Sequence, residues 1–266
     1  FIPKGFDTLD IKISILKNDI VIRKFENKKD TIKFKTWQGG PTEKKYLKPK
    51  YGFNRFNWDL RREPFKGVNK IFVYGSYNSG IVPPGNYKIR MNIGNKVYEN
   101  SFLLEPDPNF NFKPSEYLEQ EELLLSIEKN IRNLNMTVTK ARKIKMQLEN
   151  DIKKMGNKKE LYDLIEMGKK ITFKIEEWEK KLIQPKQKTF QDVINFHNKL
   201  NAEFVYLHEY VNSLDPQVTS GARERFKDLD YKLKVNMKTF ENDILESIEK
   251  YNIEYKRKGI PAIILN

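Results

Sequence analysis

The stretch LLEPDPNFNFKPS, residues 103–115, separates two halves of the chain that follow different hydrophobic periods. Its prolines at 106, 108 and 114 cannot donate to a sheet ladder, so a strand that reaches this stretch has to end. We therefore expect a domain boundary here. Residues 1–108 would form one domain, 109–114 a linker and 115–266 a second domain.

On the C-terminal side, apolar residues recur every three or four positions, as in a helix that buries one face. Ser115 can cap the first helix, which we expect to run from about 115 to 154 and to end at Gly156. Its apolar seam comprises Leu124, Ile127, Ile131, Leu134, Val138, Ala141, Leu148, Ile152 and Met155. Three more helices are expected at about 158–183, 196–213 and 217–257. This pattern favours an antiparallel four-helix, coiled-coil-like bundle.

On the N-terminal side, apolar and polar residues alternate, which is the period of a half-buried strand. Residues 9–25 are expected to form a hairpin, because Asn18 and Asp19 tolerate the positive φ of a tight turn. Further strands are expected at 31–37, 53–60, 70–75, 86–93 and 96–104. About seven short strands with no helix between them predict an immunoglobulin-like antiparallel β-sandwich. The whole chain is thus expected to be an α+β, two-domain protein.

The segment YGFNRFNWDLRREPF, residues 51–65, allows two interpretations. Phe56 and Trp58 fall on the same side of a strand, and large apolar residues at period two favour burial in a sheet. The alternative is a carbohydrate-active unit in which Trp37, Trp58 and Tyr51 stack on sugar rings.

Composition narrows the function classes. The net charge of +14 invites an anionic partner, but lysines alternate with glutamates along the helices, which does not favour nucleic acid. No apolar run approaches the ~20 residues of a membrane-spanning helix, and the chain has no cysteine. A first residue other than Met, without a signal-peptide pattern, predicts a mature product or an excised fragment.

The sequence offers no catalytic constellation with a recognised spacing. Glu121-Glu122 and Glu176-Glu177 lie on helices rich in charged partners, where a solvated surface is the simpler interpretation. His197 and His208 have no metal-ligand spacing, and Gly39-Gly40 does not precede a helix that could cradle a phosphate. We therefore predict no catalytic residue, no cofactor and no metal site.

A long basic loop, residues 38–55, is the best candidate for a binding surface, because loops on a rigid scaffold often carry recognition. The possible contacts to a protein partner or an acidic glycan are Tyr46, Lys48, Lys50, Tyr51 and Arg55. The alternative is a solvated loop that covers the edge of the sandwich.

Several stretches resemble the C-terminal region of sortilin-like, BNR/Asp-box-repeat bacterial proteins, which are often labelled glycosyl hydrolases. They are GFNRFNWDLR (52–61), IVPPGNYKIRM (81–91), LLEPDPN (103–109), LIQPKQKTFQDVINFHNKLNAEFVYL (182–207) and the closing GIPAII. The resemblance implies an Ig-like domain, as in the flagellar hook-capping fold, and a helical tail that follow two β-propellers in an exported protein. The Asp-box pattern itself does not occur in this sequence.

These observations lead to one functional expectation. The chain would be a non-catalytic interaction and scaffold module, the C-terminal accessory region of an exported or cell-surface β-propeller protein. Its partner would be another protein, the propeller domains or a glycan, and it would have no membrane span. The alternative is a carbohydrate-binding or glycoside-hydrolase-associated unit.

Overall fold

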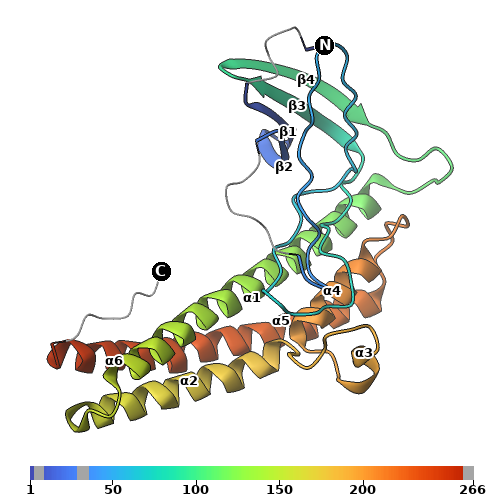
Figure 1. Ribbon diagram of the computed structural model, residues 1–266. Coiled ribbons are helices and arrows are strands. Elements are labelled where there is room, and N and C mark those ends of the chain that lie inside the picture. Colours follow the sequence, from blue (N-terminus) through green and yellow to red (C-terminus); the bar gives the residue numbers. More distant parts are fainter. Residues whose placement is uncertain (3–8, 29–35, 260–266) are drawn as a thin grey trace.

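The computed structural model describes residues 1–2, 9–28 and 36–259 (Figure 1). A small sheet lies at one end of the molecule, and long helices extend away from it as an arm (Figure 1). Within residues 36–84, the chain runs down from the sheet, and residues 65–77 pack against the helices (Figure 1). The two regions are therefore in direct contact over more than the single crossing at Pro114.

The sheet has four antiparallel strands in the order β2-β1-β3-β4. They are β1 (Ile11–Lys17), β2 (Ile20–Glu26), β3 (Gly85–Ile93) and β4 (Lys96–Leu104). The expected hairpin turn is confirmed, with φ of 51° at Asn18 and 61° at Asp19. The β3–β4 hairpin turns at Gly94, whose φ of 54° favours glycine.

The predicted β-sandwich is wrong, because the described residues form one sheet and no second sheet faces it. Residues 53–60 and 70–75 are not strands, and of the strand expected at 31–37 only residues 36–37, which are irregular, lie among the described residues. Positive φ values of 56° at Leu60 and 59° at Lys70 turn the chain away from the path of a strand. Apolar residues at every second position indicate that side chains are buried alternately. They do not show whether the segment lies beside a strand with which its backbone can form hydrogen bonds.

Alternating burial is nevertheless present in residues 53–60. Trp58 is half-buried against the sheet, with its ring centroid 5.9 Å from that of Tyr87 and 6.4 Å from that of Phe102. Its indole N–H donates to the carbonyl of Arg61 at 2.9 Å. Phe56 packs beside Phe25, with centroids 4.6 Å apart. An irregular extended segment therefore covers this face of the sheet, where the prediction placed one strand of a sandwich.

The helical region begins with the long helix α1 (Pro114–Met155). The other elements are the 3₁₀ turn η1 (Lys159–Leu161), α2 (Tyr162–Leu182), α3 (Asp192–Asn195), α4 (Leu200–Val211), α5 (Ser220–Thr239), the π-helical turn η2 (Phe240–Leu245) and α6 (Glu246–Arg257). Helix α1 packs against α2, α4 and α5, and α2 packs against α6. The prediction that Ser115 caps α1 is wrong, because Lys113 occupies the N-cap position, where its backbone N–H donates to Glu116 Oε2 at 2.6 Å. Gly156 ends the helix as expected.

The predicted four-helix bundle is also wrong. Helix α4 has only 12 residues against the 42 of α1, so it lies beside α1 only near the sheet (Figure 1). Farther from the sheet, α1, α2 and α6 form the arm without a fourth helix (Figure 1). The expected helix at 217–257 is divided into α5, η2 and α6. Periodicity located the helical segments, but it did not show which segments lie side by side.

The main hydrophobic core joins the helices to residues between β2 and β3. Phe65, Val68, Ile71, Val73 and Tyr77 are buried in the same cluster as the inner faces of α1, α2, α4 and α5. A smaller core, centred on Ile13, Ile15, Val82 and Tyr87, lies under the sheet. The division of the chain at 109–114 stays a prediction, and residues 65–77 contribute to the helical core from the N-terminal side of it. In the described part of the chain, no helix has the length and apolarity to cross a membrane.

Candidate functional site: a buried charge network between the sheet and the helices

Three charged or titratable side chains meet where the sheet region joins the helices. The exposed fractions are 6% for Arg62, 4% for Glu128 and 1% for His208. Arg62 comes from the segment between β2 and β3, Glu128 from the inner face of α1 and His208 from the inner face of α4. Ionisable groups are rarely buried this far unless they are paired.

Glu128 is the centre of this group. Its Oε1 accepts a hydrogen bond from Arg62 Nη2 at 2.8 Å, and its Oε2 accepts one from Arg62 Nε at 3.2 Å. The backbone N–H of Gly80 donates to Oε1 at 2.7 Å, and His208 Nε2 lies 3.4 Å from the same oxygen. A Cβ at Gly80 would lie 2.8 Å from Arg62 Nη2, so the close approach of the backbone requires glycine here.

The electrostatics keep the carboxylate ionised. Burial alone would raise the pKa of Glu128, but hydrogen bonds from His208 and Arg62 and the charge of Arg62 outweigh it, so the pKa falls to about 2. The network also reaches the sheet. Arg62 Nη1 lies 3.5 Å from Glu121 Oε1, and Lys17, at the end of β1, approaches Glu121 Oε2 to 2.6 Å.

This arrangement is suited to holding chain segments together and not to proton transfer. A carboxyl group with a pKa near 2 does not carry a proton at neutral pH, so Glu128 cannot act as a general acid there. Its oxygens are directed at Arg62, Gly80 and His208, which hold two chain segments against α1. Among the described residues, no group of three or more His, Cys, Asp and Glu side chains could hold a metal ion.

A hollow of about 240 Å³ adjoins His208. It is lined by Arg61, Ser76, Asn78, His208, Glu209 and Asn212. Two of these side chains fasten the neighbouring loop: Glu209 Oε1 accepts from the backbone N–H of Ser76 at 2.6 Å, and Asn212 Oδ1 accepts from that of Ile81 at 2.9 Å. Nδ1 of His208 is buried and has no hydrogen-bond partner in the described part of the chain. The walls of the hollow therefore mostly serve to attach residues 76–81 to α4.

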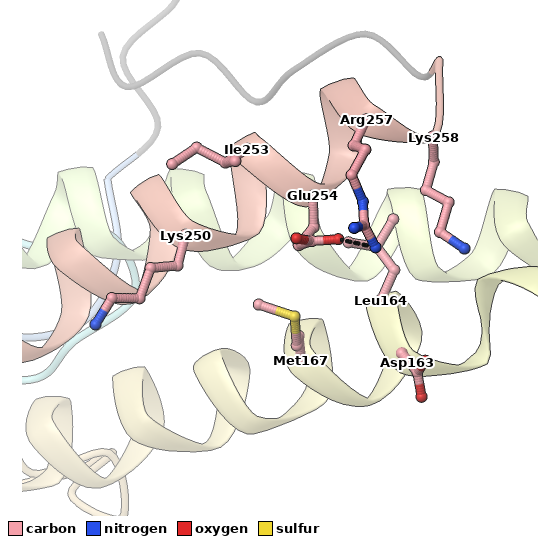
Figure 2. Close-up of a pocket in the computed structure, with 8 residues that line it drawn as sticks. All are labelled: Asp163, Leu164, Met167, Lys250, Ile253, Glu254, Arg257 and Lys258. Atoms are coloured by element: carbon pink, nitrogen blue, oxygen red, sulfur yellow. Dashed lines mark ion pairs between the residues drawn. The ribbon is translucent and has the colours of Figure 1, made fainter.

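A larger hollow of about 470 Å³ lies between α2 and α6 at the end of the arm farther from the sheet (Figure 2). Figure 2 shows Leu164 and Met167 of α2 facing α6. Charged side chains surround this apolar floor, and Arg257 Nη2 pairs with Glu254 Oε2 at 3.0 Å. The hollow is an open groove of mixed charge with no converging set of polar groups.

The predicted contact residues lie on the loop of residues 38–55 and differ in their exposure. Lys48, Lys50 and Arg55 are exposed, and Tyr51 is 59% exposed. Tyr46 is half-buried, and the ammonium of Lys44 lies 5.6 Å from the centre of its ring.

An aromatic tip gathers around Tyr51. The ring of Phe1 lies 6.1 Å from that of Tyr51 and 5.4 Å from that of Phe53, which is 90% exposed. The backbone pairing of Ile2 with Gly52 holds this tip together. The prediction that these loop residues bind a partner stays a prediction, and Phe53 is the exposed aromatic that it did not include.

The Arg62–Glu128–His208 network was not predicted from the sequence. One signal was present, since Glu128 lies four residues after Leu124 and three before Ile131 of the apolar seam, which places it on the buried face of α1. Sequence spacing gave no means of finding its partners, because Arg62 is 66 residues and His208 is 80 residues away.

Comparison of the chain with protein-family models finds no match. Comparisons with curated proteins and with solved structures also give no significant match.

Proposed function

We propose that the chain is a non-catalytic scaffold and interaction module that holds its sheet region in a fixed position on a long helical arm. The observation that carries this proposal is the Arg62–Glu128–His208 network. It joins the segment between β2 and β3 to α1 and α4 with hydrogen bonds that are shielded from water. A rigid connection of this kind is useful where one surface must be presented at a fixed distance from another.

Two further contacts support a fixed arrangement. The side chains of residues 65–77 contribute to the helical core, so that core cannot separate from the sheet region without exposing apolar surface. Lys17 of β1 and Glu121 of α1 form an ion pair that is largely shielded from solvent, with side-chain exposures of 21% and 14%. The same region is therefore held by apolar packing and by paired charges.

The wider setting of this module is also part of the proposal. The resemblance to the C-terminal regions of BNR/Asp-box proteins suggests a parent protein that is exported and carries β-propellers, with the propellers or another protein as the partner. Of the stretches that carry the resemblance, GFNRFNWDLR at 52–61 packs on the core under the sheet through Phe56, Trp58 and Leu60. The closing GIPAII lies, except for its glycine, outside the described residues.

A second candidate function is glycan binding, and the aromatic tip favours it. Tyr51 and Phe53 are exposed beside Lys48 and Lys50, a combination that can stack on sugar rings and attract acidic groups. Trp37 and Trp58, which the carbohydrate alternative stacks on sugar rings, fit this role less well. Both are half-buried, and their indole N–H groups donate to backbone carbonyls at 2.8 Å for Trp37 and 2.9 Å for Trp58.

One experiment separates the two functions. The chain is incubated with a panel of neutral and acidic polysaccharides, and both binding and the release of reducing ends are measured. If the chain is a scaffold, no polysaccharide is turned over, and the wild type and the Phe53→Ala variant bind the polysaccharides equally weakly. Retention that is lost in Phe53→Ala would favour the glycan function, and turnover that is abolished by Glu209→Gln would contradict the non-catalytic proposal.

A further inference from the structure

The two edges of the sheet differ in how they are covered. On the β2 edge, the backbone N–H of Leu47 donates to Glu26 O at 2.8 Å, and that of Glu63 donates to Ile22 O at 2.9 Å. On the other edge, Val97–Leu104 of β4 form backbone hydrogen bonds only with β3, as far as the described residues are concerned. β4 also lies on the side of the sheet away from the helices (Figure 1).

β4 lacks the features that usually protect an edge strand from pairing. It contains no proline, and it pairs with β3 from Lys96 to Leu104 without a bulge. Glu99 is a charged residue within the strand, and its carboxylate is already paired with Arg90 of β3. On the face that points away from the small core, Val97 is 56% exposed and Leu103 is 60% exposed.

The turn geometry shows which backbone groups face outward. In a two-residue hairpin, the residues that flank the turn, here Ile93 and Lys96, exchange hydrogen bonds with each other. Inward and outward residues then alternate along the strand. The N–H and C=O groups of Val97, Glu99, Ser101 and Leu103 therefore point to the open edge.

We propose that this edge pairs with β4 of a second copy of the chain, antiparallel and centred on Asn100. In this register, every apolar residue from Val97 to Leu103 faces an apolar residue, Leu104 at the end of the strand faces Lys96, and no like charges meet. The pairs are Val97 with Leu103, Tyr98 with Phe102, Glu99 with Ser101, and Asn100 with Asn100. The outward N–H and C=O groups of Val97 and Glu99 also face those of Leu103 and Ser101 in the second copy, so hydrogen bonds can form between the two strands. The order of side chains in β4 is thus complementary to itself, and the two sheets become continuous.

Charge sets the conditions for this pairing. The edge is nearly neutral, whereas each whole chain carries a net charge of +14. Long-range repulsion between two copies therefore opposes association at low salt, and screening at higher ionic strength relieves it. We expect a dimer that becomes tighter as salt rises, opposite to what an acidic partner strand would show. The pairing goes beyond the proposed scaffold function and does not use the Arg62–Glu128–His208 network.

Single cysteines test the register, because the chain has none of its own. In the proposed dimer, Asn100 faces its own copy at a position without interstrand hydrogen bonds, where Cα atoms are ~4.5 Å apart and a disulfide can form. Leu103 would lie roughly 20 Å from its copy. Under mild oxidation, Asn100→Cys should form a covalent dimer at least about tenfold faster than the equally accessible Leu103→Cys. Equal rates for the two variants, or no covalent dimer of Asn100→Cys, would overturn the proposal.

Charge variants give an independent check by sedimentation equilibrium over a range of protein concentrations. Val97→Lys with Leu103→Lys places lysines opposite each other twice and should lower the association constant by about tenfold or more. Val97→Glu with Leu103→Lys changes the same positions but places opposite charges together, so it should stay dimeric. If both double variants and the wild type sediment as monomers throughout, a second copy is not the occupant of this edge. The junction variant Glu128→Gln should keep the Asn100→Cys cross-link, which separates this test from that of the scaffold function.

Discussion

Glu128→Gln should lower the free energy of unfolding by about 3–5 kcal/mol at neutral pH. The substitution keeps the shape of the side chain but leaves the Arg62 guanidinium buried without its counter-charge, and an uncompensated buried charge is strongly destabilising. Urea denaturation followed by circular dichroism measures the change. The matched control is Glu122→Gln on the exposed face of the same helix, which should change the stability by less than about 0.5 kcal/mol.

The pH dependence of this difference identifies its cause. The pKa of Glu128 falls from an ordinary 4.5 to about 2 in the folded chain. A depressed carboxyl pKa contributes stability that is fully present above the unfolded value and is lost as pH falls through the folded value. The gap between the wild type and Glu128→Gln should therefore shrink between pH 4.5 and pH 2. A gap that stays constant over this range would show that the loss comes from packing and not from the ion pair.

Phe65→Ala should lower the free energy of unfolding by about 3–5 kcal/mol, because it removes a side chain that is only 2% exposed from the helical core. Phe65 comes from the segment between β2 and β3, and its ring packs edge-on against His208, with centroids 5.1 Å apart. The loss should therefore appear in the unfolding of the helices as well as in that of the sheet.

The control for this variant is Phe53→Ala, which removes the same ring from a position that is 90% exposed and should be nearly neutral. Circular dichroism at the helical band follows the unfolding of the helices. Tryptophan fluorescence reports both regions, since Trp178 lies in α2 and Trp58 packs on the sheet. If Phe65→Ala shifts the fluorescence transition and leaves the helical transition unchanged, residues 65–77 do not belong to the helical core.

The sequence was most informative where local periodicity determines structure. The seam from Leu124 to Met155 and the glycine at 156 predicted α1 almost to the residue, because a helix satisfies its hydrogen bonds within itself. The two hairpins were equally accessible, since Asn18-Asp19 and Gly94-Asn95 have the turn chemistry of two-residue loops. In both cases, a few neighbouring residues carry the whole signal.

The errors arose where structure depends on distant partners. Phe56 and Trp58 have the alternation of a strand, but their segment finds no backbone neighbour and covers the sheet as an irregular chain. The joint between the two regions escaped prediction for the same reason. The period of α1 places Glu128 on the buried face, but nothing in the sequence near Arg62 or His208 marks them as its partners. Period does not encode which elements become neighbours, and it could not reveal this network.

If the sheet has a fixed position on the helical arm, the distance between a spin label on the sheet and one at the far end of the arm has a single value. Asn95→Cys labels the β3–β4 turn and Lys158→Cys labels the turn that follows the far end of α1, both at exposed positions in a chain without native cysteines. A second pair of labels at Lys129 and Lys153, both on α1, gives the width of the distance distribution that is expected for two sites on one rigid helix. A fixed position of the sheet predicts one narrow distance distribution of similar width for Asn95 and Lys158, which broadens in Glu128→Gln. A broad or multiple distribution in the wild type would contradict it.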